Sequence, residues 1–129
     1  MNYGQARAYA VNVSRSGSIL GLDSIENLMH ELGDIQERLK IIHIAGTNGK
    51  GSTGAYLERV LIEAGYRVGR YSSPAVFDPM EVWRINLQSM SHEEYADIME
   101  QVKCACDRMV EKGMEHPTIF EVETAMAFL

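Results

Sequence analysis

An apolar stretch followed by a glycine-rich turn, at residues 41–53, limits the possible folds of this chain more than any other feature. It reads I-I-H-I-A-G-T-N-G-K-G-S-T, and a helical pattern begins directly after it. Glycines let a backbone turn sharply and approach an anion closely. The order of strand, turn, lysine and helix gathers backbone N–H groups and one ammonium group at a helix N-terminus. Such a point binds polyphosphate.

Each residue type in this turn has a physical role in phosphate binding. Lys50 can reach the β- and γ-phosphates, and Ser52 or Thr53 can place a hydroxyl on a phosphate-bound Mg²⁺. The common pattern G-x-x-x-x-G-K-[ST] is not met, because Ile44 stands at its first glycine and an extra Gly51 follows Lys50. A glycine-rich turn with a surface lysine is the simpler alternative. The nucleotide-binding candidates are Thr47, Asn48, Gly49, Lys50, Gly51, Ser52 and Thr53.

The motif G-T-N-G-K-G-S-T after H-I-A resembles the ATP loop of the folylpolyglutamate synthase/dihydrofolate synthase family, in the Mur ligase superfamily. Mur ligases usually carry G-T-N-G-K-[ST]-[ST], so Gly51 favours the folate branch. Segments 21–33, 63–74 and 117–128 also resemble the family. The resemblance implies an α/β P-loop fold with a mainly parallel sheet, in which residues 1–129 form the N-terminal part of the ATP-binding ligase domain. Because relatives are longer and the last helical pattern has no stop signal, we expect a truncated chain without the C-terminal domain.

The resemblance implies an ATP-dependent ligase that joins L-glutamate to folate or dihydropteroate through an acyl phosphate. Its cofactors would be ATP and Mg²⁺, and Lys50 would be the catalytic residue. Ser52, Ser73 and Glu121 would hold the metal. Without the resemblance, Ser73 is a turn serine before a proline, and Glu121 is the second member of a capping box with Thr118. Family members also use a His and a modified Lys beyond this segment, so we expect the fragment alone to be inactive.

Two segments are candidates for substrate binding. The loop 14–21 resembles the pterin-side region of family members and offers Leu20 and Gly21, although the same residues would suit a plain linker. The segment after Ser73 keeps the Glu of the family pattern S-P-x-x-x-x-F-x-E-R-I-x-I-N-G at Glu81. Its Phe, Arg, Ile and Gly are replaced by Pro79, Val82, Trp83 and Leu87. Phe77 and Arg84 could take over the folate contacts.

Two other function classes remain open on the residues. A Mur-type ligase would join an amino acid to a nucleotide-linked muropeptide, and a non-catalytic nucleotide-binding module would act by interaction. The net charge of −6 argues against a nucleic-acid surface. No signal pattern or bilayer-length apolar run is present. Cys104 and Cys106 lie two apart in a helical pattern, which favours free thiols of a cytoplasmic protein. We expect a monomer at full length.

Apolar spacing predicts helices at 3–13, at 23–32 and from the phosphate loop to 64. Capping boxes S-x-x-E and T-x-x-E predict two more, at 91–112 and from 118 onward. Strands are expected at 40–45 and 66–71 as a parallel pair, with 82–87 extended. His43 would be a core histidine. The helix after the phosphate loop should turn inward Tyr56, Leu57, Val60 and Leu61. The last helix should need a partner, from a longer chain or another copy, for Val122, Ala125, Met126 and Leu129.

Overall fold

The structure, a computed structural model, describes residues 1–18 and 20–129, and Ile19 of the expected loop 14–21 lies outside the described residues. The chain divides into two compact units. Unit 1 comprises residues 1–39 and 92–129, and unit 2 comprises residues 40–91. None of the helices in the described part of the chain is long and apolar enough to cross a bilayer.

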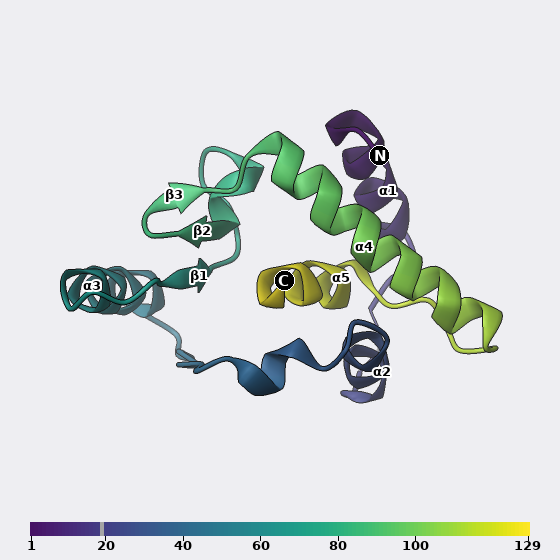
Figure 1. Cartoon of the computed structure of the whole chain (residues 1–129), viewed down its shortest axis with the longest axis horizontal. Coiled ribbons are helices and arrows are strands. Elements are labelled where there is room, and N and C mark those ends of the chain that lie inside the picture. The colour runs from purple at the N-terminus through teal and green to yellow at the C-terminus, as the bar shows by residue number, and fades with distance from the viewer. Residues whose placement is uncertain (19) are drawn as a thin grey trace. The chain divides into compact units, whose positions relative to one another are not determined.

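Unit 1 is helical and has a continuous apolar core. It contains α1 (Tyr3–Ser14), α2 (Asp23–Glu31), the 3₁₀ helix η1 (Ile35–Arg38), α4 (His92–Glu111) and α5 (Ile119–Phe128). α4 is the longest helix and contacts α1, α2 and α5 (Figure 1). Its buried positions recur at one-turn spacing, as in an amphipathic helix; they include Tyr95, Met99, Val102, Cys106 and Met109. The expected bounds of these α-helices are met closely.

The two cysteines of α4 are free, as their spacing predicted. Cys104 is exposed and Cys106 is buried. Burial raises the pKa of the Cys106 thiol to about 11. This thiol therefore stays protonated near neutral pH and packs as a small apolar side chain.

The apolar face of α5 is buried inside unit 1. Val122, Ala125 and Met126 are at most 1% exposed, and α5 contacts α1, α2 and α4. The prediction that this face needs a partner outside residues 1–129 is therefore wrong for these three residues, whereas the fourth, Leu129, is 40% exposed. The periodicity showed that the face is apolar, but it could not show that α1 and α2, distant in sequence, fold back to cover it.

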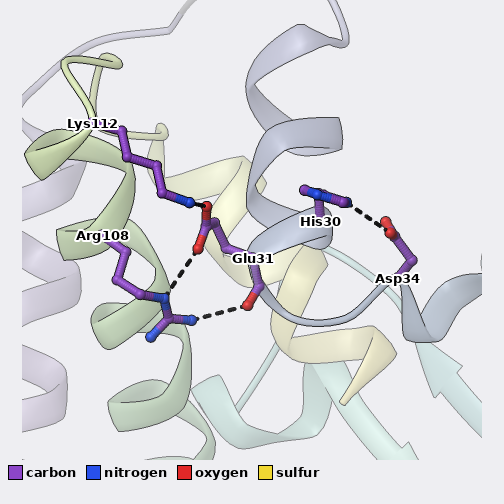
Figure 2. A network of polar contacts seen from close by, with 5 residues as sticks. All are labelled: His30, Glu31, Asp34, Arg108 and Lys112. Carbon is purple, nitrogen blue, oxygen red and sulfur yellow. Dashed lines mark hydrogen bonds and ion pairs between the residues drawn. The ribbon is translucent and has the colours of Figure 1, made fainter.

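An ion-pair network joins the end of α2 to α4, as Figure 2 shows. Arg108 Nε donates to Glu31 Oε2 at 3.0 Å, and Arg108 Nη2 donates to the Glu31 carbonyl oxygen at 2.9 Å. Lys112 pairs with the other oxygen of the same carboxylate. Beside them, His30 Nδ1 lies 2.9 Å from Asp34 Oδ2. The hydrogen bonds from Lys112 and Arg108 hold the pKa of Glu31 below its usual value of 4.5.

Unit 2 combines one helix with a small sheet. It contains α3 (Lys50–Glu63), β1 (Gly69–Tyr71), the 3₁₀ helix η2 (Pro79–Val82), β2 (Trp83–Ile85) and β3 (Gln88–Ser89). The strands pair antiparallel in the order β1-β2-β3 (Figure 1). The expected mainly parallel sheet is not formed by the described residues. A strand needs a hydrogen-bonded neighbour, and residues 40–45 have none there.

Two further predictions about unit 2 are wrong. His43 is exposed, because the segment that carries it is not part of a sheet. On α3, Tyr56 is 76% and Val60 is 65% exposed, while Leu57 and Leu61 are half-buried. The buried side chain of this helix is Glu58, which is 2% exposed. The orientation of α3 is therefore set by a charged residue, and apolar periodicity could not reveal it.

A two-residue turn, Asn86-Leu87, joins β2 to β3. Both residues have positive φ, at 47° and 70°, and turns of this kind favour Asn-Gly for that reason. Two hydrogen bonds to Val68 fix the turn: Asn86 N donates to the Val68 carbonyl, and Val68 N donates to Asn86 Oδ1, both at 2.9 Å. Leu87, which stands where the family pattern has Gly, is therefore held in a backbone conformation that glycine adopts more easily.

Replacing Leu87 with Gly should raise the free energy of unfolding by about 0.5–1 kcal/mol. The left-handed conformation costs a non-glycine residue roughly 1–2 kcal/mol, and the greater freedom of glycine in the unfolded chain cancels part of the gain. Chemical denaturation measures the difference. Leu87→Ala keeps a Cβ and should not gain stability. If the Gly variant is less stable than the Ala variant, strain at this position is not significant.

The Glu31 network should make stability depend on pH. Because the folded-state pKa of Glu31 is lowered, the ionised carboxylate stabilises the fold above about pH 4.5, and this contribution is lost as the pH falls through the folded-state pKa. Glu31→Gln should therefore lower Tm near neutral pH, and the difference should shrink in acid. Asp107→Asn, which removes an exposed partner of Lys103 within α4, should have little effect. A Tm difference independent of pH would contradict the assignment.

Candidate functional site

The predicted phosphate loop lies at the start of α3. Gly49 is the residue before the helix and has φ 76°, in the left-handed region. Thr53 N donates to the Gly49 carbonyl at 2.9 Å. The side chain of Lys50 folds back over the loop, and its ammonium group donates to the Gly46 carbonyl. A glycine-rich bend followed by the start of a helix is therefore present, as predicted.

The loop is open to a ligand. Residues 47–53 are all exposed. The first N–H groups of a helix have no acceptor within the helix, and the first turn of α3 carries no acidic residue. The loop thus offers backbone donors and an ammonium group without a carboxylate that would compete with an anion.

A buried ion-pair cluster in unit 2 was missed by the sequence analysis. Glu58 Oε2 accepts hydrogen bonds from Arg70 Nη1 and from Arg84 Nη2, both at 3.0 Å. Arg84 was a candidate for substrate binding, and its guanidinium is engaged here by Glu58. The sequence signal was a lone acidic residue between Leu57 and Leu61 on a half-buried helix, which is too weak to interpret without a structure.

The loop after β1 carries the other candidates of unit 2. Ser73 is the second residue after the end of β1 and is exposed, and Phe77 is 94% exposed. Glu81 organises this loop by accepting hydrogen bonds from Val76 N and from Phe77 N, the latter at 3.0 Å. These backbone hydrogen bonds lower the pKa of Glu81. The residue that keeps the family pattern therefore shapes the loop between Ser73 and η2.

Unit 1 contains a pocket of about 300 Å³. Its lining includes the two predicted substrate residues Leu20 and Gly21, together with Ser24 and Asn27 of α2 and Glu121 of α5. The structure therefore brings one predicted metal ligand and two predicted substrate residues to the same pocket. Ser24 is an addition that the sequence analysis did not make.

Glu121 has its carboxylate fixed at one oxygen. Its Oε2 accepts from Thr118 N at 2.7 Å, from Thr118 Oγ1 at 3.1 Å and from Ser24 Oγ at 3.0 Å. The first contact confirms the expected capping box. Glu121 is 7% exposed, and no hydrogen bond among the described residues uses its Oε1. The capping role therefore uses Oε2 alone.

The predicted metal ligands lie in both units. Ser52 and Ser73 belong to unit 2 and Glu121 to unit 1. The described residues contain no group of three His, Cys, Asp or Glu side chains that could hold a metal ion by themselves. A magnesium site built from two hydroxyls and one carboxylate stays a prediction.

Comparison with known proteins shows what the chain is related to. It is 36% identical over 127 residues to the dihydrofolate synthase/folylpolyglutamate synthase of Bacillus subtilis (strain 168), an alignment that covers 98% of this chain and 30% of that protein. The chain is a homologue of folylpolyglutamate and dihydrofolate synthases. No protein-family profile matches it.

Solved structures of folylpolyglutamate synthases share this fold. The complex of one with AMPPCP and folate aligns with a TM-score of 0.88 and 31% identity, covering 99% of this chain and 32% of that chain. A bifunctional folylpolyglutamate synthase/dihydrofolate synthase with Mn, AMPPNP and L-glutamate bound aligns with a TM-score of 0.81 and 33% identity, covering 95% of this chain and 29% of that chain. The chain spans about 30% of the length of the B. subtilis relative. Its predicted family and Mur-ligase-like fold are confirmed by these comparisons.

Substitutions of Glu121 should separate its structural role from any role in binding. Glu121→Ala leaves the buried Thr118 N–H without an acceptor, so it should lower the free energy of unfolding by about 1–3 kcal/mol. Glu121→Gln keeps an oxygen acceptor, and Gln also serves in capping boxes, so its loss should be smaller. Denaturation of both variants, with exposed Glu115→Gln as the control, measures this. Equal losses for Ala and Gln would show that the cap does not depend on the oxygen.

Proposed function

We propose that this chain is the N-terminal, nucleotide-binding part of an ATP-dependent ligase that adds L-glutamate to folate or dihydropteroate. The observation that carries this proposal is the phosphate loop at the start of α3, within a chain of which 98% aligns with a folate ligase. AMPPCP and AMPPNP are ATP analogues, and their presence in structures of relatives supports ATP as the nucleotide. The folate enzymes among the relatives favour this branch over a Mur-type ligase.

In the proposed reaction a substrate carboxylate attacks the γ-phosphate of ATP, the bond from the γ-phosphorus to the β–γ bridging oxygen breaks, and an acyl phosphate and ADP are formed. The amine of L-glutamate then displaces phosphate. Lys50 and the N–H groups of the loop would stabilise the charge of the transferring phosphoryl group. The Lys50 ammonium donates to a single carbonyl oxygen, that of Gly46. It can therefore turn to a phosphate by side-chain rotation alone.

The donor set fits a magnesium ion. Ser52, Ser73 and Glu121 supply hydroxyl and carboxylate oxygens, the ligand type that Mg²⁺ takes alongside phosphates. Thr118 and Ser24 bond Glu121 Oε2, so Oε1 is the oxygen that would hold the metal. When bound, Mg²⁺ would neutralise charge on the phosphate oxygens.

The pocket of unit 1 would take part of the folate or dihydropteroate. Leu20 and Gly21 lie at its lining, as expected for the pterin-side contact. In unit 2, Phe77 has an exposed ring that could stack on a flat heterocycle. Arg84 would have to leave Glu58 to bind a substrate carboxylate, so its substrate role is the weakest of these proposals. The free cysteines fit a cytoplasmic enzyme, and we expect the full-length enzyme to be a monomer.

Titration of this chain with Mg-ATP tests the nucleotide site. Lys50→Ala should weaken binding about 10–150-fold, the effect of losing one charge-assisted hydrogen bond. Lys40→Ala removes an exposed lysine outside the loop and should leave the affinity unchanged. Equal affinity of the Lys50 variant and the unaltered chain would exclude the phosphate role. Glutamate incorporation by this chain alone, above that of Lys50→Ala, would contradict our expectation that turnover needs more of the enzyme.

A further inference from the structure

Two arginines of neighbouring strands share one buried carboxylate in unit 2. Arg70 of β1 and Arg84 of β2 are direct partners in the ladder, and like charges in such positions repel. Glu58 of α3 lies against both, with Oε2 at 3.0 Å from each guanidinium. A carboxylate that is 2% exposed requires such pairing. The cluster therefore fixes the guanidinium of Arg70 relative to α3.

Arg70 makes a second contact, with the phosphate loop itself. Its Nη2 donates to the carbonyl oxygen of Gly51 at 2.9 Å. The Arg70 side chain passes close to Gly54, which lies one helical turn after Gly51 on α3. A Cβ added at Gly54 would lie 3.3 Å from Arg70 Nε. The absence of a side chain at Gly54 thus leaves room for the guanidinium. The side chain of Arg70 thus connects the buried carboxylate of Glu58 to the motif G-T-N-G-K-G-S.

The carbonyl that accepts from Arg70 belongs to the peptide group between Gly51 and Ser52. A trans peptide is planar, so its C=O and N–H bonds point in opposite directions. Fixing the Gly51 carbonyl from one side therefore fixes the direction of the Ser52 N–H on the other side, toward the helix start. A hydrogen bond from a charged donor to a carbonyl also strengthens the N–H of the same peptide as a donor. Both effects favour an anion at the loop.

We propose that Arg70 is a positioning residue for the nucleotide phosphates, and this rests on the ATP-binding function proposed above. Glu58 holds Arg70, and Arg70 orients and polarises the Gly51–Ser52 peptide. Arg70 itself does not touch the nucleotide. Arg84 is the second partner of Glu58 Oε2, a structural contact that it would have to give up for the substrate contact proposed above.

Three variants of the 129-residue chain test this proposal. Arg70→Lys keeps the charge but lacks the planar fork that reaches two acceptors at once. Gly54→Ala keeps Arg70 but pushes its guanidinium by a few tenths of an ångström. Arg59→Ala, on the same helix, removes an exposed ion pair with Glu63 and serves as the control. Calorimetric titration with Mg-ATP, thermal melting and the amide proton shift of Ser52 are measured for each.

We expect Arg70→Lys to weaken Mg-ATP binding roughly tenfold, and Gly54→Ala to weaken it by a smaller factor. In both variants the Ser52 amide proton should move upfield without ligand, as its peptide becomes less polarised. Gly54→Ala should keep or raise Tm, since Ala is the better helix former. Weaker binding without a loss of stability is an outcome that a merely structural role would not give.

The possible failures can be told apart. If the unaltered chain and Arg59→Ala bind no Mg-ATP, the nucleotide-binding function is wrong, and the role of Arg70 falls with it. If they bind and both test variants bind equally well with an unmoved Ser52 amide, the positioning role alone is wrong. If Arg70→Lys does not fold, Gly54→Ala decides the question by the same two measurements.

Discussion

The pairing of Glu58 with two arginines is the interaction on which unit 2 depends. Residues 40–91 bury few apolar side chains, namely Met80, Val82 and Trp83. A core of this size cannot by itself fix a helix on three short strands. The carboxylate of Glu58 joins α3 to β1 and β2 at once. Loss of one partner from a fully buried pair costs about 3–5 kcal/mol, and the partly exposed arginines place this cluster below that range.

Unit 1 is stabilised in a different way. The buried side chains of α4 face α1, α2 and α5, so the apolar face of one long helix serves as the common surface for three others. Polar contacts such as that of Glu31 with Arg108 lie at the margin of this core (Figure 2). Unit 1 is therefore stabilised mainly by buried apolar area. Unit 2, which carries the phosphate loop, is stabilised mainly by ion pairs and hydrogen bonds of defined direction. Directional contacts suit a loop whose peptide groups must point at a ligand.

The sequence predicted those parts of the structure that depend on local patterns. Helix periodicity predicted α1 and α2 nearly to the residue, the S-x-x-E pattern and a terminal glycine did the same for α4, and the T-x-x-E pattern located the capping box of α5. The glycine spacing placed the phosphate loop between an apolar segment and a helix. These features depend on residues a few positions apart, and their physical causes act within one turn of the chain.

The errors concern features that depend on residues far apart in sequence. Residues 40–45 have the apolar, β-branched side chains of a strand. A strand, however, forms only beside a hydrogen-bonded partner strand, and no local sequence pattern shows whether such a partner is present. The inward face of α3 was assigned to Tyr56 and Val60, yet pairing with Arg70 and Arg84 turns Glu58 inward instead. Propensity and periodicity describe one segment at a time, whereas a buried ion pair is a property of three segments together.

Glu121 shows how one residue can satisfy a local pattern and a distant requirement. The T-x-x-E motif is sufficient to explain a glutamate at this position, and the hydrogen bonds of Thr118 to Oε2 bear this out. Ser24 then adds a contact from α2, which also shapes the pocket of unit 1. A carboxylate that is already ordered by its helix start loses little further freedom when its other oxygen binds a ligand. The capping box thus provides a preorganised oxygen at the pocket, and the structural role favours the proposed metal role instead of competing with it.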